Sequence, residues 1–115
     1  MVLNQTYSLV ALDIDGTMIG EDRQIKPELI QAIIRVQSAG AVVSVSTGRT
    51  LKPALRIAEQ ARAAGPVICF QGAMTYDQVT KTTIRHERLD QDVTTQAITA
   101  LLSVVPEVMM FLGDD

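Results

Sequence analysis

Residues 9–17 read LVALDIDGT, a short apolar run followed by two aspartates and a turn. The run predicts a buried strand that ends at Asp13. Residues i and i+2 of an extended chain point to the same side, so Asp13 and Asp15 address one small volume. Two carboxylates this close repel each other unless a cation or a shared proton compensates. The spacing therefore predicts a site for a divalent metal, for acid–base chemistry, or for both.

These aspartates also have a simpler interpretation, because Asp and Gly are common in ordinary turns. Their position favours a functional site. In open α/β sheets, ligands bind just beyond the carboxyl ends of the strands. Asp13 and Asp15 stand at such an end, directly after the apolar run.

Two further apolar segments, residues 41–46 and 67–70, predict strands. Between the predicted strands, apolar residues recur at helical spacing. They predict one helix from Pro27 to Gly40 and another from Thr50 to Gly65-Pro66. This alternation predicts an α/β fold with a Rossmann-like parallel sheet. Right-handed crossovers bring the carboxyl ends of parallel strands to one edge. We therefore expect the residues that follow the three strands to converge, namely Asp13, Thr47 and Gln71.

The pattern changes after Gly72, where two short runs, residues 74–76 and 82–85, flank a polar turn and predict a hairpin. A third helix is expected next, capped by Asp90 or Asp92 and ended by Pro106. Its apolar face consists of Val93, Ala97, Ile98, Leu101 and Leu102. A last apolar strand is predicted over residues 108–112.

Composition excludes several classes of function. The chain has 115 residues, a net charge of −3, 3% aromatic residues and no Trp, which argues against a nucleic-acid interface. One cysteine, Cys69, rules out an internal disulfide and fits a reducing compartment. No apolar segment approaches the roughly 20 residues that span a bilayer, and residues 1–7 lack the features of a secretory signal. A cytoplasmic protein without a membrane segment is expected.

Phosphoryl transfer fits the paired aspartates. The Asp13 carboxylate can attack phosphorus and form an aspartyl-phosphate. A divalent cation such as Mg²⁺ removes the repulsion between this carboxylate and the anionic group. Asp15 is then the acid that protonates the leaving oxygen and the base that activates water. Backbone N–H groups around Gly16 and Thr17 are candidate ligands for phosphate oxygens.

Residues 46–49, Ser-Thr-Gly-Arg, follow the second predicted strand and precede a helix. The Thr47 hydroxyl, exposed amides around Gly48 and a helix N-terminus together favour an anion. The alternative is an ordinary turn in which Arg49 is a solvated surface charge. The pairing with the upstream aspartate motif favours the anion site.

The combination resembles the haloacid dehalogenase superfamily, and within it the Cof-type (subfamily IIB) sugar-phosphate phosphatases. Residues 13–17 match the first family motif, and Thr47 matches the second in the Thr-Gly-Arg context of that branch. Residues 70–73, Phe-Gln-Gly-Ala, are similar to the branch's Asn-Gly-Ala stretch, with Gln71 where Asn is usual. The resemblance covers residues 8–90 best.

The resemblance implies a Mg²⁺-dependent phosphohydrolase with an aspartyl-phosphate intermediate. Asp13 is then the nucleophile and a metal ligand, and Asp15 the general acid and base that also offers the metal its backbone carbonyl. The implied phosphate- and substrate-binding residues are Gly16, Thr17, Thr47, Gly48, Arg49, Gln71 and Gly72.

The resemblance also implies an incomplete core over residues 1–86, followed by the start of an α+β cap domain over residues 87–115. The third-motif Lys or Arg has no convincing counterpart, since Lys81 falls in the predicted hairpin turn. The fourth family motif is an acidic pair that follows a strand, and Asp114-Asp115 is a candidate for it. The start of the cap domain is the preferred interpretation of this region. Without two further family strands, the first strand has an open apolar edge, which predicts self-association or marginal stability.

Four interpretations of function remain open. The first is a hydrolase of small phosphorylated metabolites, sugar phosphates foremost, and the second is a phosphomutase of the same superfamily. The third is a catalytically incomplete module that binds phosphate or a partner chain. The fourth, which fits the motifs worst, is a receiver-like domain that is phosphorylated on Asp13.

Overall fold

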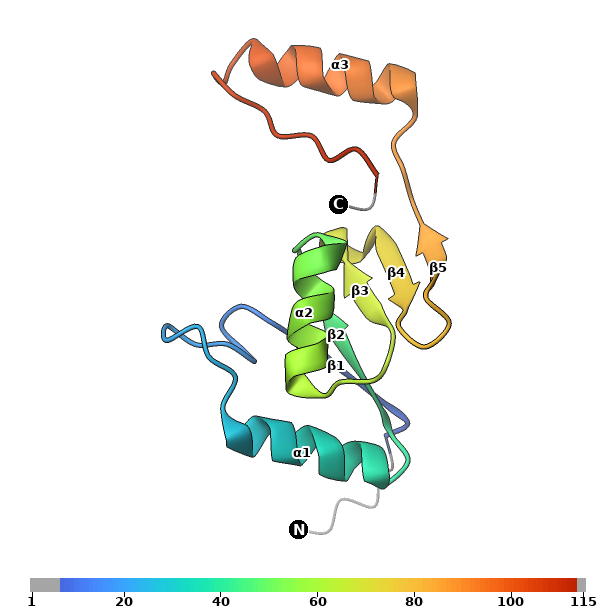
Figure 1. Ribbon diagram of the computed structural model, residues 1–115. Helices are drawn as coiled ribbons and strands as arrows, with labels where there is room; N and C mark the ends of the chain where they lie inside the picture. Colours follow the sequence, from blue (N-terminus) through green and yellow to red (C-terminus); the bar gives the residue numbers. More distant parts are fainter. Residues whose placement is uncertain (1–6, 114–115) are drawn as a thin grey trace.

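The computed structural model describes residues 7–113 and contains one five-stranded sheet (Figure 1). Its strands lie in chain order, β1-β2-β3-β4-β5. β1, β2 and β3 are parallel, and β4 and β5 form an antiparallel hairpin at one side. The strands are β1 (Leu9–Asp13), β2 (Val42–Ser46), β3 (Val67–Cys69), β4 (Met74–Asp77) and β5 (Thr82–His86). The predicted α/β fold and the predicted hairpin are both confirmed.

Two helices connect the parallel strands. α1 (Pro27–Ser38) begins with Pro in its first turn, where a missing N–H costs nothing. It ends before Gly40, whose φ of +97° is the left-handed conformation expected after a helix. α2 (Leu51–Ala61) lies against the sheet (Figure 1). Its buried side chains, Leu51, Ala54, Ala58 and Ala61, recur at the helical spacing that the sequence shows after Thr50.

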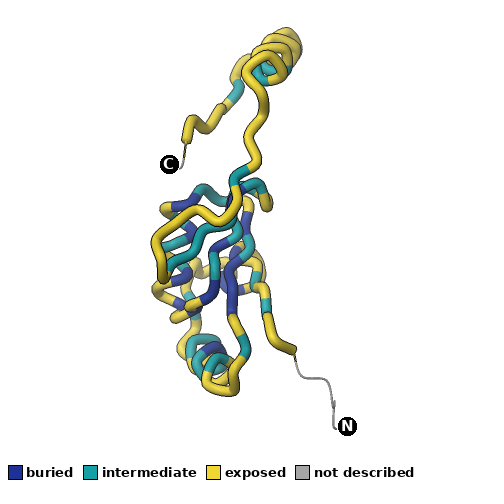
Figure 2. Tube along the Cα trace, turned by 90° about the vertical axis from the view of Figure 1, so that its right-hand side faces the viewer, coloured by how far each residue is buried: buried dark blue, intermediate teal, exposed yellow. Residues whose placement is uncertain are grey.

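The core lies between these helices and the strands. Val43, Val45, Val67 and Cys69 are buried in one cluster with residues of α1 and α2. Figure 2 shows that the buried residues concentrate in the sheet and in the segments packed on it. The apolar runs of the sequence are thus buried because the parallel strands pack under a helix layer, and β2 buries three consecutive residues, Val43, Ser44 and Val45.

Several helix ends differ from the sequence prediction. α2 ends at Ala61, because Arg62 adopts a left-handed conformation with a φ of +61°, so the helix stops before Gly65-Pro66. Thr50 and Asp90 occupy the N-cap positions of α2 and α3 (Gln91–Leu102), and Asp90 is one of the two predicted caps, but neither side chain makes a capping hydrogen bond. A residue in the N-cap position does not by itself form the cap.

The predicted last strand is wrong. Residues 107–112 form neither helix nor strand, because within residues 7–113 no strand lies beside them to complete a hydrogen-bonded ladder. The helix before them, α3, has no buried residue and stands away from the sheet (Figures 1 and 2). The acidic pair at 114–115 lies outside the described residues.

β1 forms one edge of the sheet. Its only strand partner in the described part of the chain is β2. Leu9 is 55% exposed and Ala11 is also exposed, whereas Val10 and Leu12 pack against the core cluster. The open apolar edge that the sequence predicts is present among residues 7–113.

Candidate active site

The turn after β1 is fixed by its own backbone and by three buried side chains, Ile14, Met18 and Ile19. The Ile14 carbonyl accepts hydrogen bonds from the N–H groups of Met18 and Ile19, each at 3.0 Å. The Gly16 N–H donates to the Ile19 carbonyl at 2.9 Å, and Gly16 has a φ of +81°, which glycine adopts without strain. Ile14 is completely buried. The two flanking aspartates, Asp13 and Asp15, are held at the surface as a result.

The loop after β2 carries Thr47, which is 5% exposed. Its N–H donates to the Ile68 carbonyl at 2.9 Å, so the loop continues the contact between β2 and β3. Its hydroxyl oxygen accepts a hydrogen bond from the Arg49 N–H at 3.1 Å. A hydroxyl that accepts one bond still has its proton to donate to a ligand.

The segment after β3, Phe70–Gly72, has an unusual backbone. Phe70, Gln71 and Gly72 have φ values of +50°, +56° and +94°. Left-handed residues other than Gly cost about 1–2 kcal/mol each and cluster at functional sites. Two hydrogen bonds hold the segment to the Thr47 loop, from the Phe70 N–H to the Arg49 carbonyl at 2.9 Å and from the Gln71 N–H to the Thr47 carbonyl at 3.2 Å.

These three segments enclose a hollow of about 290 Å³ at the carboxyl ends of the strands. Asp13 and Ser46 are paired in the register of β1 and β2, which places one carboxylate and one hydroxyl side by side. The residues that line the hollow are Asp13, Ser46, Thr47, Gly48, Gln71 and Gly72. The structure therefore brings together five residues that the sequence singles out.

One lining residue, Ser46, is absent from the predicted set. The signal that could have found it is the strand register, because the last residues of two adjacent parallel strands stand next to each other. Four predicted residues do not line the hollow: Asp15, Gly16, Thr17 and Arg49. The N–H groups of Gly16 and Thr17 already donate within the turn, to Ile19 and Ile14.

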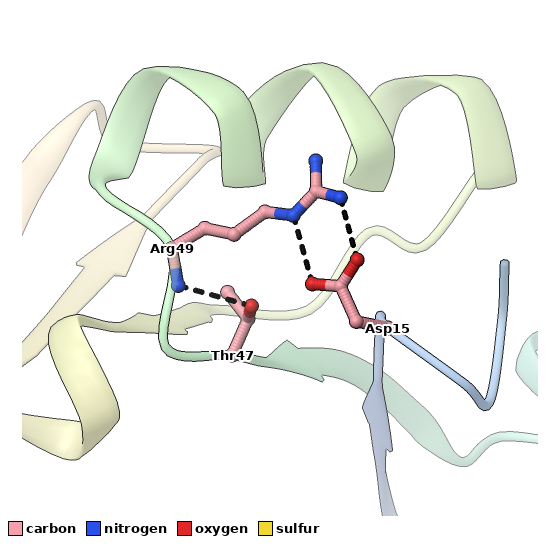
Figure 3. Close-up of polar contacts among 3 residues, drawn as sticks. All are labelled: Asp15, Thr47 and Arg49. Carbon is pink, nitrogen blue, oxygen red and sulfur yellow. Dashed lines mark hydrogen bonds and ion pairs between the residues drawn. The ribbon is translucent and has the colours of Figure 1, made fainter. Parts of the chain in front are cut away.

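Asp15 and Arg49 form a two-point ion pair (Figure 3). The Arg49 Nε–H donates to Asp15 Oδ2 at 3.0 Å, and the Nη2–H donates to Oδ1 at 2.6 Å. The side chains are 37% and 63% exposed, in the order Arg49 and Asp15. The hydrogen bonds from Arg49, together with the positive charges of Arg49 and Arg23, hold the pKa of the Asp15 carboxyl below its usual range.

The Asp13 carboxylate is in a different situation. It has no hydrogen-bond or ion-pair partner among residues 7–113, and it faces the hollow. In the same part of the chain, no group of three His, Cys, Asp or Glu residues could hold a metal ion. Mg²⁺ typically needs only one or two carboxylates, with water and substrate phosphate completing its shell. The Asp15 backbone carbonyl accepts no backbone hydrogen bond in the turn. Together with the Asp13 carboxylate, it fits the small number of protein ligands that Mg²⁺ needs.

A second, larger hollow of about 510 Å³ lies beyond the segment Phe70–Gly72. Apolar side chains from α3 and from residues 108–112 line most of it, with Phe70 on the side of the sheet, and His86, Glu87 and Arg88 also lie in its wall. The rings of Phe70 and Phe111 meet edge to face, with centroids 5.8 Å apart and an angle of 69°. The segment Phe70–Gly72 therefore contributes to both hollows.

Comparison with known proteins identifies relatives. A family model described as haloacid dehalogenase-like hydrolase matches residues 10–115. The chain is 35% identical over 80 residues to the pyridoxal phosphate phosphatase of Escherichia coli, covering 69% of this chain and 29% of that protein. It is 32% identical over 68 residues to a 5-amino-6-(5-phospho-D-ribitylamino)uracil phosphatase of Bacillus subtilis, covering 59% of this chain and 25% of that protein.

A solved structure shows the same architecture. A haloacid dehalogenase-like hydrolase of Bacillus subtilis superimposes with a TM-score of 0.74 at 30% identity, over 84% of this chain and 33% of that chain. The chain thus spans about a third or less of the length of these three proteins. No helix within residues 7–113 is long and apolar enough to cross a membrane. With the family model matching nearly its whole length, the chain belongs to the haloacid dehalogenase-like hydrolases.

Proposed function

We propose that this chain carries the nucleophile of a Mg²⁺-dependent phosphohydrolase that acts on small phosphorylated metabolites, sugar phosphates foremost. One observation carries the proposal. The hollow at the strand ends combines an unpaired Asp13 carboxylate with the Thr47 hydroxyl and the backbone of Gly48 and Gly72. A carboxylate beside hydrogen-bond donors is the arrangement that nucleophilic phosphoryl transfer requires.

The proposed reaction has two steps. In the first, an Asp13 carboxylate oxygen attacks phosphorus, the bond to the ester oxygen breaks, and Asp15 gives that oxygen a proton. In the second, Asp15 takes a proton from water, which attacks the phosphorus of the aspartyl-phosphate. Inorganic phosphate leaves and the Asp13 carboxylate is restored. The Thr47 hydroxyl proton, left available because its oxygen accepts from Arg49, binds a phosphoryl oxygen throughout.

Asp13 and the Asp15 carbonyl are the groups that would hold Mg²⁺. When bound, the ion would supply positive charge that lowers the repulsion between the nucleophile and the phosphoryl group. Its donors from residues 7–113 are few, so we expect the metal to bind weakly in the absence of a phosphorylated ligand. The remaining proposed contacts to phosphate or substrate come from Gly48, Gln71 and Gly72.

The apolar hollow suggests where the organic part of the substrate lies. It begins at Phe70, next to the two residues that close the polar hollow, Gln71 and Gly72. Two relatives are named for phosphate esters of small ring compounds, pyridoxal and a ribitylaminouracil. We infer a small organic phosphate whose carbon skeleton extends toward α3. Residues 87–115 are then the start of a cap domain, and residues 1–86 are the core.

A catalytically incomplete phosphate-binding module is the second candidate. Two observations favour it: no Lys or Arg lines the hollow in the described part of the chain, and the Asp15 side chain is paired with Arg49. A phosphomutase using the same Asp13 is distinguished by its product, because it returns an isomeric phosphate ester and releases no inorganic phosphate.

The test is Mg²⁺-dependent release of phosphate from p-nitrophenyl phosphate and from a panel of sugar phosphates. We expect activity that Asp13→Asn abolishes and that Asp22→Asn, which removes an exposed carboxylate of the next loop, leaves intact. Phosphate binding without turnover in the wild-type chain supports the binding module. Equal activity in the wild-type chain and Asp13→Asn contradicts the proposal.

A further inference from the structure

We propose that Arg49 is a positioning residue that exchanges partners: it holds Asp15 while the hollow is empty and turns to the phosphoryl group when an ester enters. The inference rests on the proposed function and adds to it a step that the motifs do not specify. It gives Arg49 and Asp15 a linked role, whereas the sequence suggests two independent ones.

The backbone of Arg49 is fixed beside the hollow. Its N–H donates to the Thr47 hydroxyl oxygen at 3.1 Å, and its carbonyl accepts from the Phe70 N–H at 2.9 Å. The residue before it, Gly48, lines the hollow. Figure 3 shows the Arg49 side chain running from this loop across to Asp15. The position of the main chain is therefore set, and the side chain alone decides which anion the guanidinium meets.

The Asp15 side chain depends on Arg49 for its place. Both of its oxygens accept from the guanidinium, and no other side chain within residues 7–113 donates to them. The carboxylate is 63% exposed, so packing does not hold it. Arg23 adds an attraction without a hydrogen bond. A planar guanidinium orients a carboxylate at two points, so Arg49 fixes the orientation of the Asp15 carboxylate, and Asp15 is not among the residues that line the hollow.

The charge of the hollow explains the exchange. Its one ionised lining group is the Asp13 carboxylate, which repels an incoming phosphoryl dianion. A guanidinium binds carboxylate and phosphate with the same fork geometry, and the phosphoryl group has the larger charge. An ester in the hollow therefore competes with Asp15 for Arg49. Departure of Arg49 frees Asp15 to turn toward the leaving-group oxygen.

A double-mutant cycle on phosphate affinity tests this competition. Inorganic phosphate is titrated in the presence of Mg²⁺ into the wild-type chain, Asp15→Asn, Arg49→Gln and the double variant, with binding followed by NMR chemical shifts of the Thr47 and Gly48 amides. Glu59→Gln, on the exposed side of α2, is the control for loss of one negative charge. Circular dichroism verifies that each variant is folded.

The exchange predicts that Asp15→Asn tightens phosphate binding about two- to five-fold, the range that an exposed ion pair permits. This gain must vanish in the Arg49→Gln background, because no guanidinium is left to release. Simple repulsion between Asp15 and phosphate would instead give the same gain in both backgrounds, and that result overturns the inference. Glu59→Gln is expected to bind like the wild type.

A second measurement observes Arg49 directly. The Nε–H resonance of Arg49 should shift when phosphate is added to the wild type, and at saturation it should reach the same position in the wild type and in Asp15→Asn, because both chains then hold the guanidinium on phosphate. A resonance that stays at its starting position while the Thr47 and Gly48 amides saturate with phosphate contradicts the exchange. Arg49→Lys keeps the positive charge but loses the two-point hydrogen bonding of the guanidinium. With Lys in place of Arg49, the effect of Asp15→Asn on phosphate affinity should be less than half as large.

The outcomes separate this inference from the proposed function. One outcome is turnover that requires Asp13 together with an Asp15→Asn effect on phosphate affinity that does not depend on Arg49. This outcome overturns the partner exchange and leaves the proposed phosphohydrolase in place. Phosphate binding with full coupling and no turnover supports the inference in a chain that binds without catalysis. Absence of phosphate binding in all four chains overturns both.

Discussion

Asp13 and Ser46 are paired in the register of β1 and β2, each as the last residue of its strand. Because the two strands are parallel, their carboxyl ends lie at the same edge of the sheet, where ligands bind in open α/β folds. This pairing puts the carboxylate of one segment beside the Ser-Thr-Gly loop of another, although the two are far apart in the sequence. The hollow is therefore a direct consequence of strand register.

The first prediction concerns the pH behaviour of Asp15. Arg49 holds the pKa of its carboxyl below the usual range, so Arg49→Gln should raise that pKa toward an ordinary value, as followed by NMR titration. Asp77 is the internal control. Its pKa is also low, mainly because the Val79 N–H donates to its carboxylate, and it should not respond to Arg49→Gln. An Asp15 midpoint unchanged by Arg49→Gln contradicts the ion pair in solution.

The same shift has a consequence for stability. A carboxyl with a lowered folded-state pKa contributes stability that is present above its unfolded pKa and is lost as pH falls through the folded pKa. Removal of the Asp15–Arg49 pair should therefore destabilise the chain at neutral pH and have little effect in strong acid. Urea unfolding of the wild type and Arg49→Gln at several pH values measures this. A difference that grows toward acid pH has the wrong sign.

A second prediction concerns the anchor of the aspartate turn. Ile14 is completely buried and separates the two exposed aspartates. Ile14→Ala should destabilise the chain by about 2–5 kcal/mol, and Ile14→Val by about 0.5–1.5 kcal/mol. Urea denaturation gives both values. Equal stability of Ile14→Ala and the wild type would show that this turn is not packed into the core as described.

A third prediction compares two glycines. A Cβ on Gly65 would lie 2.5 Å from the Val43 carbonyl oxygen and 2.7 Å from Ser44 Oγ, so Gly65→Ala should cost about 1–3 kcal/mol. A Cβ on Gly48 would overlap the side-chain amide of Gln71, which is free to move away. Gly48→Ala should therefore weaken phosphate binding with little loss of stability.

Gly20→Ala is the matched control for this pair, since the nearest atom to a Cβ there is Asp22 Oδ1 at 3.7 Å. Unfolding midpoints in urea and phosphate titrations on all three variants separate packing from ligand contact. A Gly48→Ala chain that binds phosphate like the wild type would show that the position of the Gln71 side chain does not affect phosphate binding.

The fourth prediction concerns the edge strand. β1 has one strand partner among residues 7–113 and exposes Leu9 and Ala11. Apolar edge strands promote association, and a Lys on the edge opposes it. We expect the chain to self-associate in sedimentation velocity and Leu9→Lys to shift it toward monomer. Val79→Lys, at a 79% exposed position in the hairpin turn, is the control. A wild-type monomer at all concentrations contradicts this prediction.

Local patterns in the sequence were enough to predict much of the fold. The apolar runs before Asp13 and Thr47 became adjacent strands, and the helical spacing from Leu51 to Ala61 became the buried face of α2. These features depend on periodicity, which neighbouring residues determine. The prediction of a strand over residues 108–112 was wrong because a strand also needs a partner strand, and apolar content alone does not provide one.

The candidate site was predictable in its members and less so in their contacts. Motif position placed Asp13, Thr47 and Gln71 at strand ends, and all three line the hollow. The pairing of Asp15 with Arg49 was not predictable, because it depends on how two loops from different strands face each other. The motifs predict a proton-transfer role for Asp15 and phosphate binding for Arg49, and the structure adds that the two side chains are paired with each other.

The most direct test of the central claim is to look for the covalent phosphoryl group on Asp13. The chain is mixed with Mg²⁺ and p-nitrophenyl phosphate, quenched in acid within the first turnover, and examined by intact-mass and peptide mass spectrometry. The proposed nucleophilic role of Asp13 predicts a mass increase of one phosphoryl group on the peptide that contains Asp13, absent in Asp13→Asn and in the presence of a chelator. A phosphoryl group on another residue, or none on the wild-type chain, would contradict it.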